Sequence, residues 1–282
     1  MNALERMREN RPLLAVEMRP PQAGLPSAKG MNFWIDVHHT IRHLAARDTV
    51  TFMTDNAVGQ AEEENLRHLV ANLAGDASPA RLVPFLTSKH TLDYCLMYVA
   101  RAVSNGFDTL TILGGDQSVG PPRCVEFAWQ LRQIIRERFP AVTLGGWANP
   151  FRDRTAQVDF LLRPTFFAEF FLTQIVSHHN LREVEQFQNE VRRRGVPHPG
   201  IYGVFYYQSP NPATLARMQH FFPVPIEGVT HDFAQGLSAE EITARTIRAL
   251  RNLGIEKVYI SNLGFKKPEE RYRKILDVVE AG

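Results

Sequence analysis

The chain has 282 residues, 44% apolar and 22% charged, which is enough to bury a large core in one or two domains. Its 32 basic and 30 acidic residues give a formal net charge of +2, so nucleic acid is not indicated as a partner. No apolar run approaches the roughly 18 residues that span a membrane, and the opening stretch MNALERMRENRP lacks the apolar core of a signal peptide. We therefore expect a cytoplasmic protein with no membrane partner.

Short apolar runs alternate with amphipathic stretches along the whole chain. The apolar runs predict strands at 12–18, 48–54, 81–87, 108–114, 141–147, 169–175, 200–206 and 257–262. The amphipathic stretches predict helices at 31–46, 60–74, 90–105, 121–139, 152–164, 180–194, 211–220, 238–253 and 267–280. This alternation is typical of a parallel sheet built from βαβ units. It predicts a single (β/α)₈ TIM barrel domain over 1–282, with an extra C-terminal helix.

Local signals support several boundaries. Thr91 opens a helical pattern that ends at Asn105-Gly106, a C-cap signal, and Ser238 forms a capping box with Glu241. The run 223–229 resembles a strand, but two prolines without N–H donors predict a loop or an edge there. A doubly wound open sheet is the competing fold. It is weakened because no GxGxxG or GxxxxGK[ST] motif follows any predicted strand.

Three polar residues at predicted strand ends are not explained as turn formers or caps. Glu17 interrupts the apolar strand LLAVEM, Gln174 lies inside an apolar run, and Asp116 follows a Gly-Gly pair. A salt bridge, for example from Arg19, would account for Glu17 taken alone. Because active sites of such barrels lie at the carboxyl ends of the strands, three such residues together predict a site. Turn or cap roles are expected instead for Thr87, Ser88, Asn149, Ser209 and Ser261.

Histidines and cysteines give no indication of a metal. The pairs His38-His39 and His178-His179 are adjacent, so we expect each pair to point to different faces of a helix and not to chelate. Cys95 and Cys124 belong to no CxxC or His/Cys cluster, which argues against both zinc and a disulfide framework.

The order of these residues resembles the methylenetetrahydrofolate reductase family. Glu17 before Pro20-Pro21, Thr51 in the second strand, Gly115-Asp116 after the fourth and Thr173-Gln174 in the sixth match that family in order and spacing. The resemblance implies a (β/α)₈ barrel that reduces 5,10-methylenetetrahydrofolate to 5-methyltetrahydrofolate. It implies that Glu17 is the proton donor near the pterin and that Gln174 hydrogen-bonds the folate. It also implies that Asp116, the second expected catalytic residue, lies against the pterin and the flavin.

The departures from the family pattern lie mainly on the flavin side. Where the family has Arg-Gly-Asp-Leu-Pro, this chain has Gly-Gly-Asp-Gln-Ser at 114–118, and the sixth strand continues into Ile175-Val176-Ser177-His178. The pattern is similar to the flavin-independent branch of the family, which implies hydride transfer from NADH or NADPH and no tightly bound flavin. An FAD-dependent reductase is the alternative.

Further residues are assigned with this resemblance in view. Thr51, Asp55 and Tyr206 are expected to contact the substrate, and Trp147, Asn149 and Lys89 the cofactor. Two other readings stay open: a non-catalytic folate-binding barrel, and a lyase in which Lys89, just past the third strand, forms a Schiff base. The oligomeric state and the choice between NADH and NADPH are not determined by the sequence.

Overall fold

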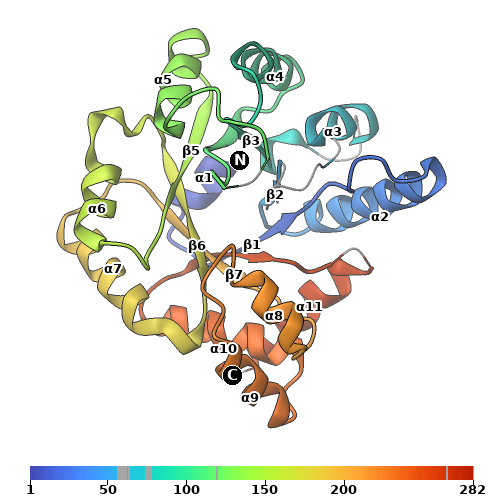
Figure 1. The fold of residues 1–282 in the computed structure, drawn as a ribbon, viewed down its shortest axis with the longest axis vertical. Helices are drawn as coiled ribbons and strands as arrows, with labels where there is room; N and C mark the ends of the chain where they lie inside the picture. Colours follow the sequence, from blue (N-terminus) through green and yellow to red (C-terminus); the bar gives the residue numbers. More distant parts are fainter. Residues whose placement is uncertain (56–61, 63, 74–77, 119, 265, 282) are drawn as a thin grey trace.

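The computed structural model describes residues 1–282 except 56–61, 63, 74–77, 119, 265 and 282. Eight parallel strands close into a barrel in chain order (Figure 1). They are β1 Leu13–Met18, β2 Thr51–Met53, β3 Leu82–Thr87, β4 Thr109–Leu113, β5 Thr143–Ala148, β6 Phe170–Val176, β7 Gly200–Phe205 and β8 Lys257–Ser261. The predicted fold class is confirmed, and no strand extends beyond its predicted range by more than one residue.

Helices surround the strands. They are α1 Ala3–Arg8, α2 Ser27–Ala45, α3 Asn65–Leu73, α4 Leu92–Ser104, α5 Ala128–Arg138, α6 Arg154–Leu162, α7 Leu181–Arg193, α8 Pro212–Met218, α9 Ile226–Ala234, α10 Ala239–Asn252 and α11 Pro268–Glu280. Short 3₁₀ turns are η2 Pro79–Arg81, η3 Pro164–Phe166 and η4 His178–Asn180. Among the described residues, no helix combines the length and apolar character needed to cross a bilayer.

Two apolar cores follow from the alternation of side chains along each strand. The inner core fills the barrel and includes Leu13, Phe52 and Phe170, whereas the outer core lies between strands and helices and includes Val16 and Met53. Because every strand is covered on both faces, the strands read as nearly continuous apolar runs. This is why the sequence revealed them so clearly.

Glycines make room for large rings inside the barrel. A Cβ built at Gly145 would lie 2.3 Å from the Phe170 ring, and one at Gly203 would lie 2.5 Å from the Tyr259 hydroxyl. Gly145 and Phe170 are partners in register on neighbouring strands, as are Gly203 and Tyr259. In each pair the large ring therefore occupies the space that a side chain at the glycine would otherwise fill.

The sequence missed two helices. Helix α1 begins at an Asn2 capping box, and its Ala3 and Met7 belong to the inner core, so it closes the amino end of the barrel. Helix α9 begins directly after Pro225, so the run 223–229 is no strand, as predicted, but is also not all loop. In that run the prolines mark the entry to a helix, where a missing N–H costs nothing. Helix α5 begins at Ala128 instead of 121.

Candidate functional site

Glu17 lies at the carboxyl end of β1, on the face that points into the barrel. The alternation that places Leu13 and Ala15 in the inner core turns Glu17 inward as well. The hydroxyl of Ser261, the last residue of β8, donates a 2.5 Å hydrogen bond to Glu17 Oε1. Burial raises the pKa of Glu17 to about 7, although the Ser261 hydrogen bond opposes this. Near neutral pH the carboxyl group is therefore divided between its protonated and ionised forms, as suits a proton donor.

A second carboxylate, Glu62, acts on the charge of Glu17. Glu62 Oε1 accepts hydrogen bonds from Arg19 Nε at 2.9 Å and from Arg19 Nη2 at 2.8 Å. After the larger effects of burial and Ser261, the positive charge of Arg19 lowers the pKa of Glu17 and the negative charge of Glu62 raises it. The sequence suggested an ion pair between Arg19 and Glu17, but in the structure Arg19 pairs with Glu62. Glu17 is instead hydrogen-bonded by Ser261.

Apolar side chains share this inward face. Leu113, Trp147 and Phe205 are partly buried and pack against the inner core, and Phe222, from the segment after α8, joins them. The rings of Phe205 and Phe222 have centroids 4.9 Å apart. Phe205 is also the partner in register of Ser261, the residue that donates to Glu17. Because Trp147 packs against the inner core, it lies on the same inward face as Glu17.

Gln174 lies at an irregularity of β6. The pairing of β6 with β7 shifts between Leu172 and Ile175, and both of these side chains belong to the inner core. Gln174 Nε2 donates to the Phe221 carbonyl at 3.2 Å, and its Oε1 accepts from the Ile175 N–H at 2.9 Å. A bulge re-aims side chains and commonly lies beside an active site. Here it ties Gln174 to the segment that follows α8.

Asp116 lies in a turn after β4. Its Oδ1 accepts hydrogen bonds from the Ser118 N–H at 2.9 Å and the Ser118 hydroxyl at 2.7 Å. These bonds lower the pKa of Asp116, and the charges of Lys89 and Arg123 act in the same direction. Lys89 Nζ donates to the Pro121 carbonyl at 2.9 Å. The bond from the Ser118 N–H makes Asp116 a turn former, contrary to the expectation from the sequence. The charges of Lys89 and Arg123 act on its carboxylate, whereas the pKa of Glu17 is dominated by burial.

The Arg123 guanidinium lies against Gly114 in the same loop. A Cβ built at position 114 would lie 2.8 Å from Arg123 Cζ, and Arg123 also donates to the Gly115 carbonyl. The folded chain therefore places the Arg123 guanidinium beside position 114, where the family pattern has arginine and this sequence has glycine.

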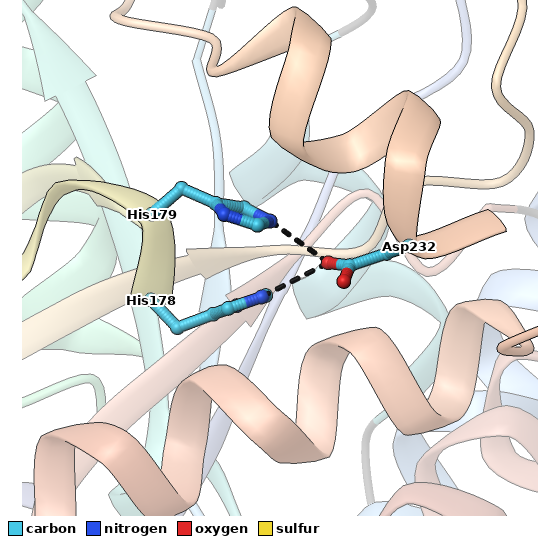
Figure 2. Close-up of side chains that lie close together, drawn as sticks. All are labelled: His178, His179 and Asp232. Atoms are coloured by element: carbon cyan, nitrogen blue, oxygen red, sulfur yellow. Dashed lines mark hydrogen bonds and ion pairs between the residues drawn. The ribbon is translucent and has the colours of Figure 1, made fainter. Parts of the chain in front are cut away.

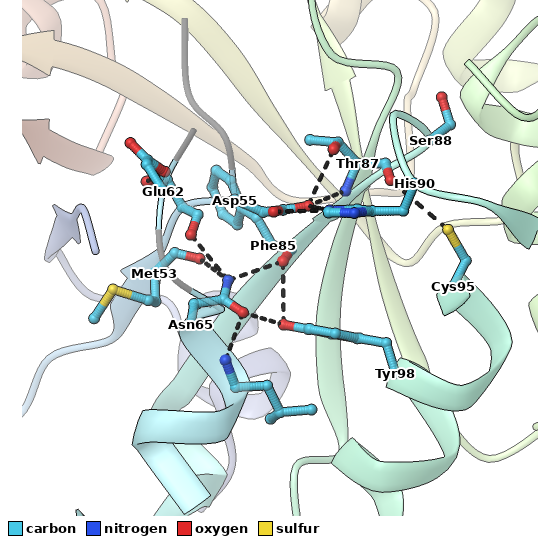
Figure 3. Close-up of polar contacts among 12 residues, drawn as sticks. Met53, Asp55, Glu62, Asn65, Phe85, Thr87, Ser88, His90, Cys95 and Tyr98 are labelled. Atoms are coloured by element: carbon cyan, nitrogen blue, oxygen red, sulfur yellow. Dashed lines mark hydrogen bonds and ion pairs between the residues drawn. The ribbon is translucent and has the colours of Figure 1, made fainter. Parts of the chain in front are cut away.

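Asp55 holds the ends of β2 and β3 together (Figure 3). Its Oδ2 accepts from the Thr87 N–H at 2.7 Å and the Thr87 hydroxyl at 3.0 Å, and His90 Nε2 lies 2.9 Å from the same oxygen. In the same view the buried Asn65 amide donates to three main-chain carbonyls, while its oxygen accepts from the Tyr98 hydroxyl at 2.7 Å. These contacts join the strand ends to α3 and α4.

Two other expected site residues face the helices, and a third is held in a turn after β5. Thr51 is in register with Val16 of the outer core, so its side chain points toward the helices. Tyr206 also belongs to the outer core, and its hydroxyl donates to Glu240 on α10 at 3.1 Å. Asn149 Oδ1 accepts from the N–H at position 151, which makes it a turn former.

The three key residues thus stand at the carboxyl ends of different strands. Glu17, Gln174 and Asp116 come from β1, β6 and the loop after β4. Within the described part of the chain, no hydrogen bond or ion pair joins any two of them. Each side chain is held at its own strand end by other partners.

No protein-family model and no curated protein matches the chain. Among solved structures, it is similar over 100% of both chains to an uncharacterized protein from Clostridium thermocellum, described as binding two copies of 5-methyl-5,6,7,8-tetrahydrofolic acid, with 16% identity and a TM-score of 0.68. The chain shares its fold with that protein. Apo-MsnO8 (12% identity, TM-score 0.59, 96% and 99% covered) and the aldo-keto reductase AKR11C1 from Bacillus halodurans (14%, 0.50, 96% and 86%) are further barrels of this kind.

Sequence reasoning missed the partners of these residues. Ser261 was expected to be a turn former, yet it positions Glu17. The predicted barrel itself carried a signal for this contact. In a closed barrel the last strand, β8, pairs with the first, β1, and both Ser261 and Glu17 lie at the carboxyl ends of these strands. For Glu62 and Arg123, which reach the site from loops, no periodic pattern carried such a signal.

Proposed function

We propose that this chain binds a reduced folate at the carboxyl ends of its barrel strands and reduces 5,10-methylenetetrahydrofolate to 5-methyltetrahydrofolate, with NADH or NADPH as the hydride donor. The observation that carries the proposal is Glu17, a carboxyl group of pKa about 7 that faces into the barrel and is held by Ser261. The whole-chain likeness to a barrel described as binding 5-methyltetrahydrofolic acid supports the ligand class.

The reaction requires a proton and a hydride at separate atoms. When the imidazolidine ring opens, the bond between N10 and the methylene carbon breaks, and Glu17 supplies the proton that N10 takes up. The resulting N5 iminium carbon accepts the hydride that the reduced nicotinamide supplies when bound, giving the N5-methyl group and the oxidised nicotinamide. Glu17, left ionised, stabilises the iminium charge and regains a proton from solvent. Asp116 and Gln174 supply acceptor and donor groups that suit the polar edge of a pterin.

A flavin-dependent reductase is the alternative, and Arg123 is the observation that favours it. Position 114 lacks the arginine of the family pattern, but Arg123 places a guanidinium against Gly114 by another route. We propose the flavin-free reaction because the other departures from the family pattern remain, among them Gln117-Ser118 in place of Leu-Pro and the sixth-strand continuation Ile175-Val176-Ser177-His178. The visible spectrum of the purified protein decides, since stoichiometric flavin absorbance would refute the flavin-free proposal.

The test is oxidation of NADH or NADPH by flavin-free protein with methylenetetrahydrofolate. Replacing Glu17 with Gln keeps the side chain's shape and its acceptor for Ser261 but removes the acid. We expect kcat/KM to fall by about 10²–10⁴-fold, the usual contribution of a general acid. A change of less than about twofold would refute the role of Glu17. The Glu280→Gln variant, an exposed carboxylate on α11, is the matched control.

Folate binding without turnover is the second candidate. It is favoured by the Clostridium thermocellum protein, which is described by what it binds and not by a reaction. Calorimetric binding of 5-methyltetrahydrofolate by a protein that oxidises neither nicotinamide would support this candidate and refute the reductase.

A further inference from the structure

A cluster of two histidines and one aspartate lies outside the barrel, beside the carboxyl end of β6. His178 and His179 belong to η4, and Asp232 belongs to α9 (Figure 2). Nε2 of His178 and Nε2 of His179 lie 2.9 Å and 2.8 Å from the same Asp232 oxygen, Oδ2. Each of these three residues offers one ligand atom, and the three atoms all lie within 4.8 Å of one another.

The adjacent histidines converge, contrary to the expectation from the sequence. Their ring centroids are only 3.9 Å apart, because the two residues lie in a 3₁₀ turn after a strand and not in an α-helix. Ser177 opens this turn, since its hydroxyl accepts from the His179 N–H and its own N–H donates to the Asn180 side chain at 2.8 Å. The turn thus directs both rings toward α9.

Helix α9 leaves space for one of the rings. A Cβ built at Gly228 would lie 2.6 Å from Cγ and Nδ1 of His179, so no other residue could stand there without moving the ring. Glycine in a helix interior is destabilising by about 0.5–1 kcal/mol relative to alanine. Its presence one turn before Asp232 is accounted for by the close approach of His179.

The ligand types suit metal binding. The cluster offers two imidazole nitrogens and a carboxylate oxygen, which are ligands that Zn²⁺ prefers.

We propose that His178, His179 and Asp232 bind a divalent transition-metal ion, with Zn²⁺ the best match and the fourth position taken by water. Two ligands at the usual zinc distance of about 2.0–2.1 Å from a tetrahedral ion lie about 3.3 Å apart. Each Nε2–Oδ2 separation, now 2.8–2.9 Å, needs to widen by only about half an ångström, a side-chain adjustment. His179 is the entry side, with 23% of its side chain exposed against 3% for Asp232.

Outer contacts of the kind found around metal ligands are already in place. Thr246 Oγ1 lies 2.8 Å from Nδ1 of His178, which orients the ring and leaves Nε2 toward the cluster. Arg245 Nη1 donates to Asp232 Oδ1 at 2.9 Å, so it leaves Oδ2 for the ion. About half of the Arg245 side chain is exposed, so solvent screens its repulsion of a cation.

The metal would fasten the segment between α8 and α9, whose Phe222 packs against the inner core. It would link the end of β6 to α9, and the segment just before α9 carries the Phe221 carbonyl that holds Gln174 and the Phe222 ring that packs on Phe205. This inference does not rest on the proposed reductase activity, because its ligands lie outside the barrel interior.

The test uses the full chain stripped of metal by a chelator and then dialysed. Zinc is titrated against a chromophoric competitor into the wild type, His179→Ala, Asp232→Asn and His43→Ala, the last removing an exposed histidine of α2 as control. We expect one Zn²⁺ per wild-type chain, unchanged binding in His43→Ala, and at least about 100-fold weaker binding in the other two variants. Equal affinity in wild type and Asp232→Asn, or no binding by the wild type, would overturn the proposal.

A second measurement needs no variant, in case one fails to fold. Co²⁺ bound by the wild type should give the visible bands of a tetrahedral N/O site, and Zn²⁺ should shift the imidazole NMR signals of two histidines. A colourless titration or unshifted imidazole signals would show that the cluster is a hydrogen-bond network only.

Discussion

Replacing Glu17 with Gln should make the protein more stable at alkaline pH while it loses activity. Burial is the main reason that the pKa of Glu17 rises from 4.5 to about 7, so the folded protein holds this proton more tightly than the unfolded chain does. Stability contributed by the neutral carboxyl is present at acid pH and is lost as the pH rises from about 4.5 through 7. Gln has no proton to lose, and its amide oxygen can still accept the Ser261 hydrogen bond.

The magnitude follows from the shift. A change from 4.5 to about 7 corresponds to about 3 kcal/mol, at 1.36 kcal/mol for each pKa unit. The wild type bears almost none of this cost at pH 4 and nearly all of it at pH 8.5. The free energy of unfolding of Glu17→Gln, relative to wild type, should therefore rise by up to about 3 kcal/mol between these two pH values.

The assay is urea unfolding of both proteins across this pH range, followed by circular dichroism. Glu280→Gln serves as control, because this carboxylate is exposed and its replacement should leave the difference from wild type flat with pH. A difference for Glu17→Gln that does not change with pH would refute the reasoning, since it would mean that Glu17 has an ordinary pKa in the folded protein.

Three further outcomes are expected. Asn65→Ala should lower the free energy of unfolding by about 2–4 kcal/mol in urea titrations, because the buried carbonyls of Met53 and Thr54 lose this donor and only the Phe85 carbonyl keeps the Tyr98 hydroxyl; a loss below about 0.5 kcal/mol would contradict this. Gly145→Ala should cost about 1–3 kcal/mol by thermal unfolding, since its Cβ would meet the Phe170 ring, and an unchanged melting temperature would show that the barrel interior can yield. Gln174→Ala should weaken calorimetric binding of 5-methyltetrahydrofolate about tenfold by removing one oriented hydrogen-bonding group. Unaltered affinity would remove Gln174 from the proposed site.

The barrel could be predicted because its signals are local. Strands buried on both faces read as apolar runs, and helices carry caps such as the Ser238–Glu241 box, which the structure confirms. Helices α1 and α9 were missed because they are short and lie outside the repeating βα pattern. Their stability comes from what they pack against, which no local pattern records.

For the candidate site, the sequence by itself determined one thing well: a carboxylate placed in an apolar strand must carry a desolvation cost, which singled out Glu17. Only the tertiary structure decided what surrounds it, because closing the barrel brings Ser261 to Glu17 across 244 residues. The same holds for Arg123 against Gly114 and for the convergence of His178 and His179 on Asp232. Periodicity determines which face of a strand a side chain occupies, whereas strand register and loop path determine which side chains meet.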